Sequence, residues 1–194
     1  MFTGIIEAMG RVEEIEKKGT NINFVLSSPF TSELKIDQSV AHNGCCLTIV
    51  DIAGDRYTVN AIDETLEKTN LGSWQVGSLI NLERCMQMGG RLDGHIVQGH
   101  IDRTGVVEGI ENKDGSYFVS ISYDESREYT AVPQGSITVN GVSLTVAQSG
   151  SHSFSVALIP YTWEHTNLHL LKIGDSVNLE FDIIGKYVAK LMNK

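Results

Sequence analysis

The chain has 194 residues, of which 41% are hydrophobic and only three are proline, which is typical of a compact folded protein rather than a disordered one. A formal net charge of −9 disfavours nonspecific nucleic-acid binding, which depends on clustered lysine and arginine. No apolar run approaches the roughly 18 residues that a membrane span requires.

The N-terminal stretch MFTGIIEAMGRVEEI lacks the basic region and the long apolar region of a signal peptide. The chain has three cysteines, an odd and low count that fits a reducing compartment. Both observations predict a cytoplasmic protein.

Alternation of apolar and polar residues predicts β-strands in both halves of the chain. The alternating stretches are separated by turn pairs such as Asn43-Gly44 and Asn140-Gly141. Short strands at this spacing predict a sandwich or a small barrel, and closure into a barrel is favoured because it removes the strand edges. The clearest stretches are residues 21–28, 56–62, 117–123, 153–159 and 176–183.

Helical segments are predicted between these strands. SPFTSELK, residues 28–35, is compatible with one helical turn. DETLEKTNL (63–71) and PYTWEHTNL (160–168) are predicted as short helices that begin near Asp63 and Pro160.

The C-terminal segment, residues 184–194, is predicted as an amphipathic helix. Ile184, Tyr187, Val188 and Leu191 recur at spacings of three and four, which places them on one face. Periodicity alone leaves two alternatives open, because this face could pack on another subunit or on the chain's own barrel.

An internal duplication relates the two halves with a step of about 97 residues, or about 95 at the start of the chain. The matching pairs are 39–50 with 136–147, 64–83 with 161–180, and 3–15 with 98–110. The three pairs of matching segments occur in the same order in both halves. They predict two domains of similar structure, because half of the chain is long enough for a small core. The predicted boundaries are 1–97, 98–183 and the helix 184–194.

The adjacent Cys45 and Cys46 have Val142 and Ser143 as their counterparts in the second half. Cys45 is therefore expected to be a small buried hydrophobic residue. Cys46 has a polar counterpart, and it either faces a pocket or is an inert thiol of a strand. Cys85 and the histidines supply no spacing typical of metal ligands, so no metal site is predicted.

His100 stands where the first half has Ile5, in an otherwise similar frame. A single histidine on a strand is commonly structural, but an imidazole can also transfer protons near neutral pH. His95 precedes the repeat frame and is the weaker candidate.

Six motifs together resemble the riboflavin synthases of the α-chain type, over nearly the whole chain and in family order. They are MFTGI, SVAHNGCCLT, ETLEKTNLG, GGRLDGHIVQGHID, NGVSLTV and IPYTWEHTNL. The resemblance implies an all-β protein with two tandem six-stranded Greek-key barrels, each a lumazine-binding repeat. It also implies a C-terminal helix that assembles a homotrimer.

The resemblance implies a transferase that needs no cofactor. Two molecules of 6,7-dimethyl-8-ribityllumazine would give riboflavin and 5-amino-6-ribitylaminouracil, with the active site between the N-terminal barrel of one subunit and the C-terminal barrel of a neighbour. It does not decide which barrel holds the donor, or whether a lumazine synthase shell encloses the trimer.

Site residues are implied by matching the family motifs position by position. The expected first pocket comprises Gly4, Ile5, Ile6, Cys46, Leu47, Thr48, Asn60, Ala61, Ile62, Asp63, Glu64 and Thr65. The expected second pocket comprises Gly99, His100, Ile101, Ser143, Leu144, Thr145, Ile159, Pro160, Tyr161, Thr162, Trp163 and Glu164. The expected catalytic residues are His100 as acid or base, Cys46 as a nucleophile or as a hydrogen-bond donor, Ser39 and, as an aromatic support, Phe2.

One position departs from the family pattern. Gln134 stands where many members have a lysine that reaches the ligand, so either a neutral hydrogen bond or another cation such as Arg103 would replace that contact.

Two other functions compete with the enzyme. A non-catalytic lumazine- or flavin-binding antenna protein would share the duplicated barrels, but such relatives typically lose the GCCLT and GHIVxGH motifs that this chain keeps. A barrel that binds single-stranded nucleic acid would need basic, aromatic-rich strands, which the acidic composition disfavours.

Overall fold

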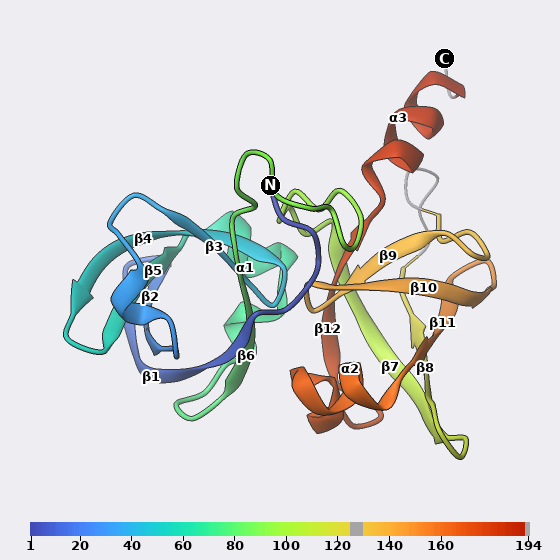
Figure 1. Ribbon diagram of the computed structural model, residues 1–194, viewed down its shortest axis with the longest axis horizontal. Helices are drawn as coiled ribbons and strands as arrows, with labels where there is room; N and C mark the ends of the chain where they lie inside the picture. Colours follow the sequence, from blue (N-terminus) through green and yellow to red (C-terminus); the bar gives the residue numbers. More distant parts are fainter. Residues whose placement is uncertain (125–129, 193–194) are drawn as a thin grey trace.

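The computed structural model describes residues 1–124 and 130–192. Two closed barrels of six antiparallel strands lie side by side, and a helix extends from the second barrel (Figure 1). This architecture confirms the all-β fold predicted from the alternation and the duplication.

The two barrels have the same strand order, which confirms the duplication. The first closes as β1-β2-β5-β4-β3-β6, and the second repeats this order as β7-β8-β11-β10-β9-β12. The first barrel consists of β1 (Ala8–Lys18), β2 (Asn21–Ser27), β3 (Ser39–His42), β4 (Cys45–Ala53), β5 (Arg56–Ala61) and β6 (Leu79–Arg84). The second consists of β7 (Arg103–Asn112), β8 (Tyr117–Ser122), β9 (Ser136–Val139), β10 (Val142–Ser149), β11 (Ser153–Leu158) and β12 (Ser176–Phe181). The domain boundaries at 97/98 and 183/184 stay predictions.

The two internal helices are shorter than predicted. α1 (Asp63–Lys68) and α2 (Pro160–His165) begin at the predicted residues, but each is followed by a separate 3-10 turn, η2 (Asn70–Ser73) and η3 (Asn167–Leu170). Thr69 and Thr166 cause the break, because each is extended and its hydroxyl accepts a hydrogen bond from the second residue of the 3-10 turn. The predicted turn in 28–35 is η1 (Thr31–Glu33).

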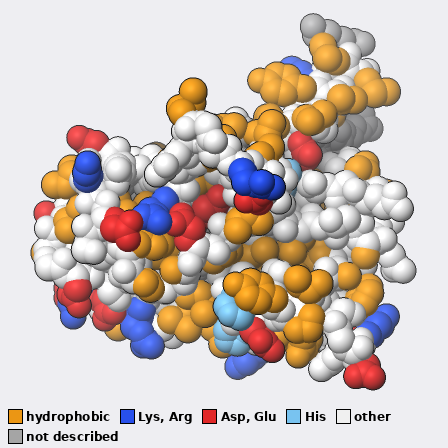
Figure 2. All heavy atoms as spheres, in the orientation of Figure 1, with side chains coloured by type: hydrophobic (Ala, Val, Ile, Leu, Met, Phe, Trp, Pro, Cys, Tyr) orange, Lys and Arg blue, Asp and Glu red, His pale blue; other side chains and the backbone are white. Residues whose placement is uncertain are grey.

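The C-terminal helix α3 (Ile183–Met192) confirms the predicted amphipathic segment, whose residues 193 and 194 lie outside the described residues. Its apolar face is exposed, and Figure 2 shows hydrophobic side chains gathered along it. None of the helices in the described part of the chain is long and apolar enough to cross a membrane.

Asparagine side chains join the two barrels through a symmetric set of buried hydrogen bonds. Asn81 Nδ2 donates to the carbonyl of Asn140 (3.0 Å), and Asn178 Nδ2 donates to the carbonyl of Asn43 (3.0 Å). The Oδ1 atoms of Asn81 and Asn178 accept from the backbone N–H groups of Asn167 and Asn70 at 2.7 Å. Every bond has its counterpart in the other half, so a pseudo-twofold axis relates the barrels.

The Asn-Gly turns that predict hairpins also form the closest contact between the barrels. A Cβ placed on Gly141 would lie 2.6 Å from the backbone nitrogen of Gly44, and one on Gly44 would lie 2.8 Å from that of Gly141. Both glycines have left-handed φ values, +79° and +81°. Only glycine therefore satisfies both the turn and the approach of the second backbone.

We expect Gly141→Ala to destabilise the protein by about 2–5 kcal/mol, because a left-handed alanine and a backbone clash add together. Gly54→Ala is the matched control, since Gly54 has φ +64° but nothing within 4 Å of its Cβ position, and it should cost only about 1–2 kcal/mol. Urea denaturation monitored through Trp74 and Trp163, one per barrel, measures both. Equal losses would contradict the packing role of Gly141.

Candidate active site

Residues 2–6 lead into the first barrel and residues 97–101 lead into the second. Each of these leading segments lies against the other barrel. Phe2 and Val97 pair through two backbone hydrogen bonds of 2.7 and 3.1 Å. Beyond this pair, Ser143 N of β10 donates to Gly4 O (2.7 Å), and Cys46 N of β4 donates to Gly99 O (2.9 Å). The two segments therefore cross over between the barrels.

Core packing agrees with this crossing. Ile6 packs against the core of the second barrel, and Ile101 belongs to the core of the first. The prediction that Gly4–Ile6 share a pocket with Cys46, and Gly99–Ile101 with Ser143, is therefore wrong in its grouping. The repeat alignment identifies equivalent residues, but it contains no information on which barrel a leading segment covers.

A cavity of about 530 Å³ lies where the first leading segment meets the second barrel. This volume is in the range that holds small organic ligands. The sequence-predicted residues that line it are Gly4, Ile5, Ile6, Ser143, Tyr161, Thr162 and Glu164, and Val142 and His165 line it too. At its rim the rings of Tyr161 and His165 are stacked, with centroids 4.0 Å apart.

His95 lies next to Ser143, although its sequence position makes it a weaker candidate than His100. It is buried, and its Nδ1 lies 2.7 Å from Ser143 Oγ. Burial lowers the pKa of His95, which favours the neutral imidazole near pH 7. The sequence signal was its place within GGRLDGHIVQGHID, although only the fold brings it to Ser143.

Cys46, Gly99 and His100 form the equivalent site at the first barrel. A Cβ on Gly99 would lie 2.7 Å from Cys46 Cβ and 2.8 Å from the ring of the buried Phe2, so the three are in close contact. The His100 side chain is exposed beside them. The structure therefore brings three of the predicted catalytic residues to one region, where Cys46 packs against Phe2 and His100 follows Gly99 in the chain.

The thiol of Cys46 is mainly protonated near neutral pH. Burial raises the pKa of Cys46, and a hydrogen bond with the Ser39 side chain opposes this rise. Ser39 pairs with Thr48 across β3 and β4, two register positions from the Ala41–Cys46 pair and therefore on the same face of the hairpin. A protonated thiol is a hydrogen-bond donor rather than a strong nucleophile.

The rims of the two sites differ in chemistry. The first barrel has an ion pair between Lys68 and Glu64 (2.7 Å) where the second has the Tyr161–His165 stack. One rim is thus charged and hydrophilic, while the other offers an aromatic face. Two sites of the same fold therefore present different surfaces to a ligand.

The other predicted residues fall into supporting and exposed groups. Trp163 stacks on Tyr117 at 4.3 Å, and Asn60 donates to Asn23 (2.6 Å). Thr65 O and Thr162 O accept from the hydroxyls of the next threonines, at 2.7 Å. Leu47, Ala61 and Leu144 are buried in the barrel cores. The exposed residues are Thr48, Ile62, Asp63, Thr145, Ile159 and Pro160.

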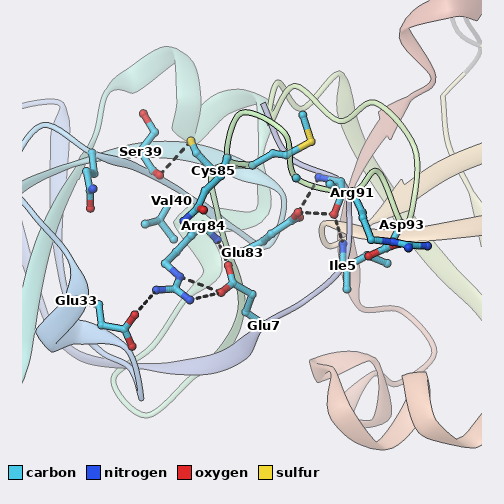
Figure 3. A pocket seen from close by; sticks show the side chains of 15 residues that line it. Ile5, Glu7, Glu33, Ser39, Val40, Glu83, Arg84, Cys85, Arg91 and Asp93 are labelled. Atoms are coloured by element: carbon cyan, nitrogen blue, oxygen red, sulfur yellow. Dashed lines mark hydrogen bonds and ion pairs between the residues drawn. The ribbon is translucent and has the colours of Figure 1, made fainter.

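A larger cavity of about 790 Å³ lies beside β3 and β6 (Figure 3). Ser39 and Cys85 line it, and Arg84 binds both Glu7 (2.6 Å) and Glu33 (2.7 Å) on its wall. Ile5 lines this cavity as well as the smaller one, so the first leading segment separates the two. Ser39 therefore faces a polar space next to the Cys46 site.

The surroundings of the candidate metal ligands and of Gln134 and Arg103 follow from the described residues. In residues 1–124 and 130–192, no three His, Cys, Asp or Glu side chains are arranged to hold a metal ion. Gln134 is exposed and donates its backbone N–H to Val146 O (2.9 Å). The Arg103 guanidinium donates to the carbonyl of Asp124.

Comparisons with known proteins agree with the duplicated fold. The family model for the lumazine binding domain matches twice, at residues 3–85 and 98–182. The chain is 39% identical over 195 residues to a riboflavin synthase of Actinobacillus pleuropneumoniae. The alignment covers 100% of this chain and 91% of the relative. It is 42% identical over 197 residues to a riboflavin synthase of Mycobacterium tuberculosis (strain H37Rv), covering 99% and 98%.

Solved structures with the same fold include LumP bound to riboflavin and LumP bound to 6,7-dimethyl-8-(1'-D-ribityl) lumazine. Each superposes with a TM-score of 0.85 at 25% identity over 93% of this chain, and covers 99% and 98% of the LumP chain, respectively. Both ligands are flat fused heterocycles that carry a ribityl chain.

The raised pKa of Cys46 predicts slow alkylation at neutral pH. In a Cys85→Ser protein the iodoacetamide rate should rise with the thiolate fraction, with a midpoint above the ordinary 9.0. Ser39→Ala removes the bond that lowers this pKa and should move the midpoint further upward. Ser136→Ala, the equivalent change in the second barrel, is the control, and a midpoint below 9.0 would contradict the assignment.

Proposed function

Because the chain belongs to the lumazine-binding domain family, we propose that it acts as a riboflavin synthase. It would convert two molecules of 6,7-dimethyl-8-ribityllumazine into riboflavin and 5-amino-6-ribitylaminouracil, which is the last step of riboflavin formation. The single observation that carries this proposal is the full-length identity of 39% to a riboflavin synthase. Two matches to the family model agree with it.

Two related sites suit a reaction between two identical molecules. Each site would hold one lumazine ring, and the rings would stack when the two sites face each other. Orienting two reactants in this way can lower a barrier by on the order of 7–11 kcal/mol at best. One substrate molecule must act as donor and the other as acceptor, so the two sites have to differ. The charged rim at Lys68 and the aromatic rim at Tyr161 would provide this difference.

The residues at each site would have separate roles. His100 is exposed beside Cys46 and would transfer the proton of the acidic C7 methyl group. Cys46 would donate a hydrogen bond from its thiol, as its raised pKa favours. At the second barrel, Ser143 would contact the ligand and the neutral His95 would orient its hydroxyl.

Assembly through α3 would complete the active site between subunits. Ile184, Tyr187 and Leu191 are 63%, 68% and 66% exposed on one face of this helix, which is typical of a surface that another chain covers. We propose a homotrimer in which the first barrel of one subunit faces the second barrel of a neighbour. A cytoplasmic location suits the three free cysteines, and a lumazine synthase shell is a further partner to test.

A ligand-binding antenna protein is the second candidate, because the LumP structures superpose closely on this chain. The thiol and imidazole at the first site favour the enzyme, since binding alone needs no group that transfers protons. The two functions separate in one assay, in which the protein is mixed with 6,7-dimethyl-8-ribityllumazine. Tight binding without riboflavin would favour the antenna protein.

His100→Gln should lower kcat for riboflavin formation by about 100-fold or more, with a smaller effect on KM, because it removes a proton-transfer group. Riboflavin absorbance measures the rate. His152→Gln, an exposed histidine in the turn between β10 and β11, is the matched control and should leave kcat unchanged. Unchanged turnover in His100→Gln would exclude this role.

Leu191→Asp should weaken the trimer and lower activity in parallel, because it places a charge in the proposed helix interface. Lys190→Asp changes charge on the neighbouring exposed position and should have little effect on assembly. Sedimentation velocity reports the mass of each variant. A fully active monomer would show that the site does not span two subunits.

A further inference from the structure

Two buried glutamates occupy equivalent places near the ends of β6 and β12. Glu83 and Glu180 are 5% and 2% exposed, and each closes a repeated Asn-Leu-Glu sequence. A buried carboxylate needs several hydrogen bonds to offset its lost hydration. Their partners therefore reveal what these side chains hold in place.

Glu180 binds three consecutive backbone N–H groups of the second leading segment. Its Oε1 accepts from Gln98 N (2.7 Å), and its Oε2 accepts from Gly99 N (2.9 Å) and His100 N (3.1 Å). One carboxylate thus orients the peptide groups from which the His100 side chain projects.

The same segment is tied to Cys46 from its other side. Gly99 O accepts from Cys46 N (2.9 Å), and the Gly99 Cα is so close to Cys46 that a Cβ would lie 2.7 Å from Cys46 Cβ. The imidazole and the thiol of the first site are therefore both located by a segment that Glu180 holds.

Burial and hydrogen bonding act in opposite directions on the pKa of Glu180. Burial raises the pKa of Glu180 to about 7, although backbone hydrogen bonds from Gln98 and Gly99 favour its charged form. Further along the segment, Asp102 accepts from Phe181 N (2.9 Å) and pairs with Lys186 of α3 (2.6 Å). Both ends of the segment are thus anchored by carboxylates next to β12.

We propose that Glu180 is a positioning residue for the first site, where it holds residues 98–100 so that His100 and Cys46 face one substrate molecule. This inference rests on the proposed function. Glu83 is its duplicate, because it accepts from Thr3 N (2.6 Å) and Gly4 N (2.9 Å), and Gly4 O in turn accepts from Ser143 N (2.7 Å). Glu83 therefore positions the second site and provides a comparison within the same chain.

The test uses the full-length protein with Cys85→Ser, so that Cys46 is the thiol open to alkylation. Cys45 does not interfere, because burial raises its pKa to about 12. Glu180→Gln keeps the size of the side chain but turns an NH2 group towards backbone donors. Glu83→Gln makes the same change at the second site, and Glu111→Gln, an exposed member of an ion pair with Lys113, is the control.

Glu180→Gln should lower kcat by at least about tenfold, towards the roughly 100-fold that a misplacement of 1 Å can cost. Because the Glu180 charge also raises the pKa of Cys46, the rates are compared for the fully ionised thiolate at high pH. There Glu180→Gln should still change the iodoacetamide rate of Cys46 by about threefold or more, while Glu83→Gln and Glu111→Gln leave that rate unaltered. If both glutamates had a purely structural role, Glu180→Gln and Glu83→Gln would both lower Tm, and neither would affect the alkylation rate of Cys46 more than the other. Retention of wild-type kcat in Glu180→Gln would overturn the proposal.

Two further measurements separate the possible failures. If the unsubstituted protein makes no riboflavin, the proposed function fails, but the alkylation rates still test Glu180. If Glu180→Gln does not fold, Glu180→Asp and amide hydrogen exchange of the unsubstituted protein replace it. The amides of Gln98, Gly99 and His100 should exchange slowly, and exchange as fast as that of exposed amides would overturn the proposal.

Discussion

The contact between two Asn-Gly turns is the constraint on which the rest of the structure depends. Gly44 and Gly141 approach so closely that neither can carry a side chain, and buried asparagines on both sides convert this contact into a network. Amide side chains suit this position because each donates and accepts at once, which satisfies the buried backbone of the opposite turn. The barrels are therefore held in one relative orientation by polar contacts at these turns and by apolar side chains of the crossed leading segments.

This orientation places the two leading segments between the barrels. Phe2 and Val97 pair near the axis, and beyond them each chain segment is held by a glutamate of one barrel and a strand of the other. The sites consequently combine side chains from both repeats. Their geometry depends on the interface as much as on either barrel, although each barrel has its own core.

Much of the fold follows from local sequence patterns, whereas the composition of each site does not. Alternation, the Asn-Gly turns and the repeated segments predict both barrels, because these signals report strand faces and tight turns. The crossing of residues 2–6 and 97–101 has no local signal, since it arises from pairing across the axis. The repeated Glu83 and Glu180 are visible in the sequence, but the peptide groups that they bind lie about 80 residues away, as the sequence separations of 80 and 81 show.

The helices give a smaller example of the same limit. The pattern through Leu71 and Leu168 is compatible with continued helix, yet Thr69 and Thr166 end it by bonding to the next turn. The asparagines that follow then reach the opposite barrel, where Asn70 and Asn167 bind Asn178 and Asn81. A local break in the helix is thus explained by a distant partner.

The crossed leading segments have a consequence for how such a chain could originate. A half-length ancestor with one leader, one Asn-Gly turn and one buried glutamate would be self-complementary, because two copies related by a true twofold axis could exchange leaders. Fusion of the two copies would keep every one of these contacts while freeing each copy to mutate separately. Ile5 and His100 occupy equivalent places in the present chain, and their difference is one that a symmetric pair of identical chains could never acquire.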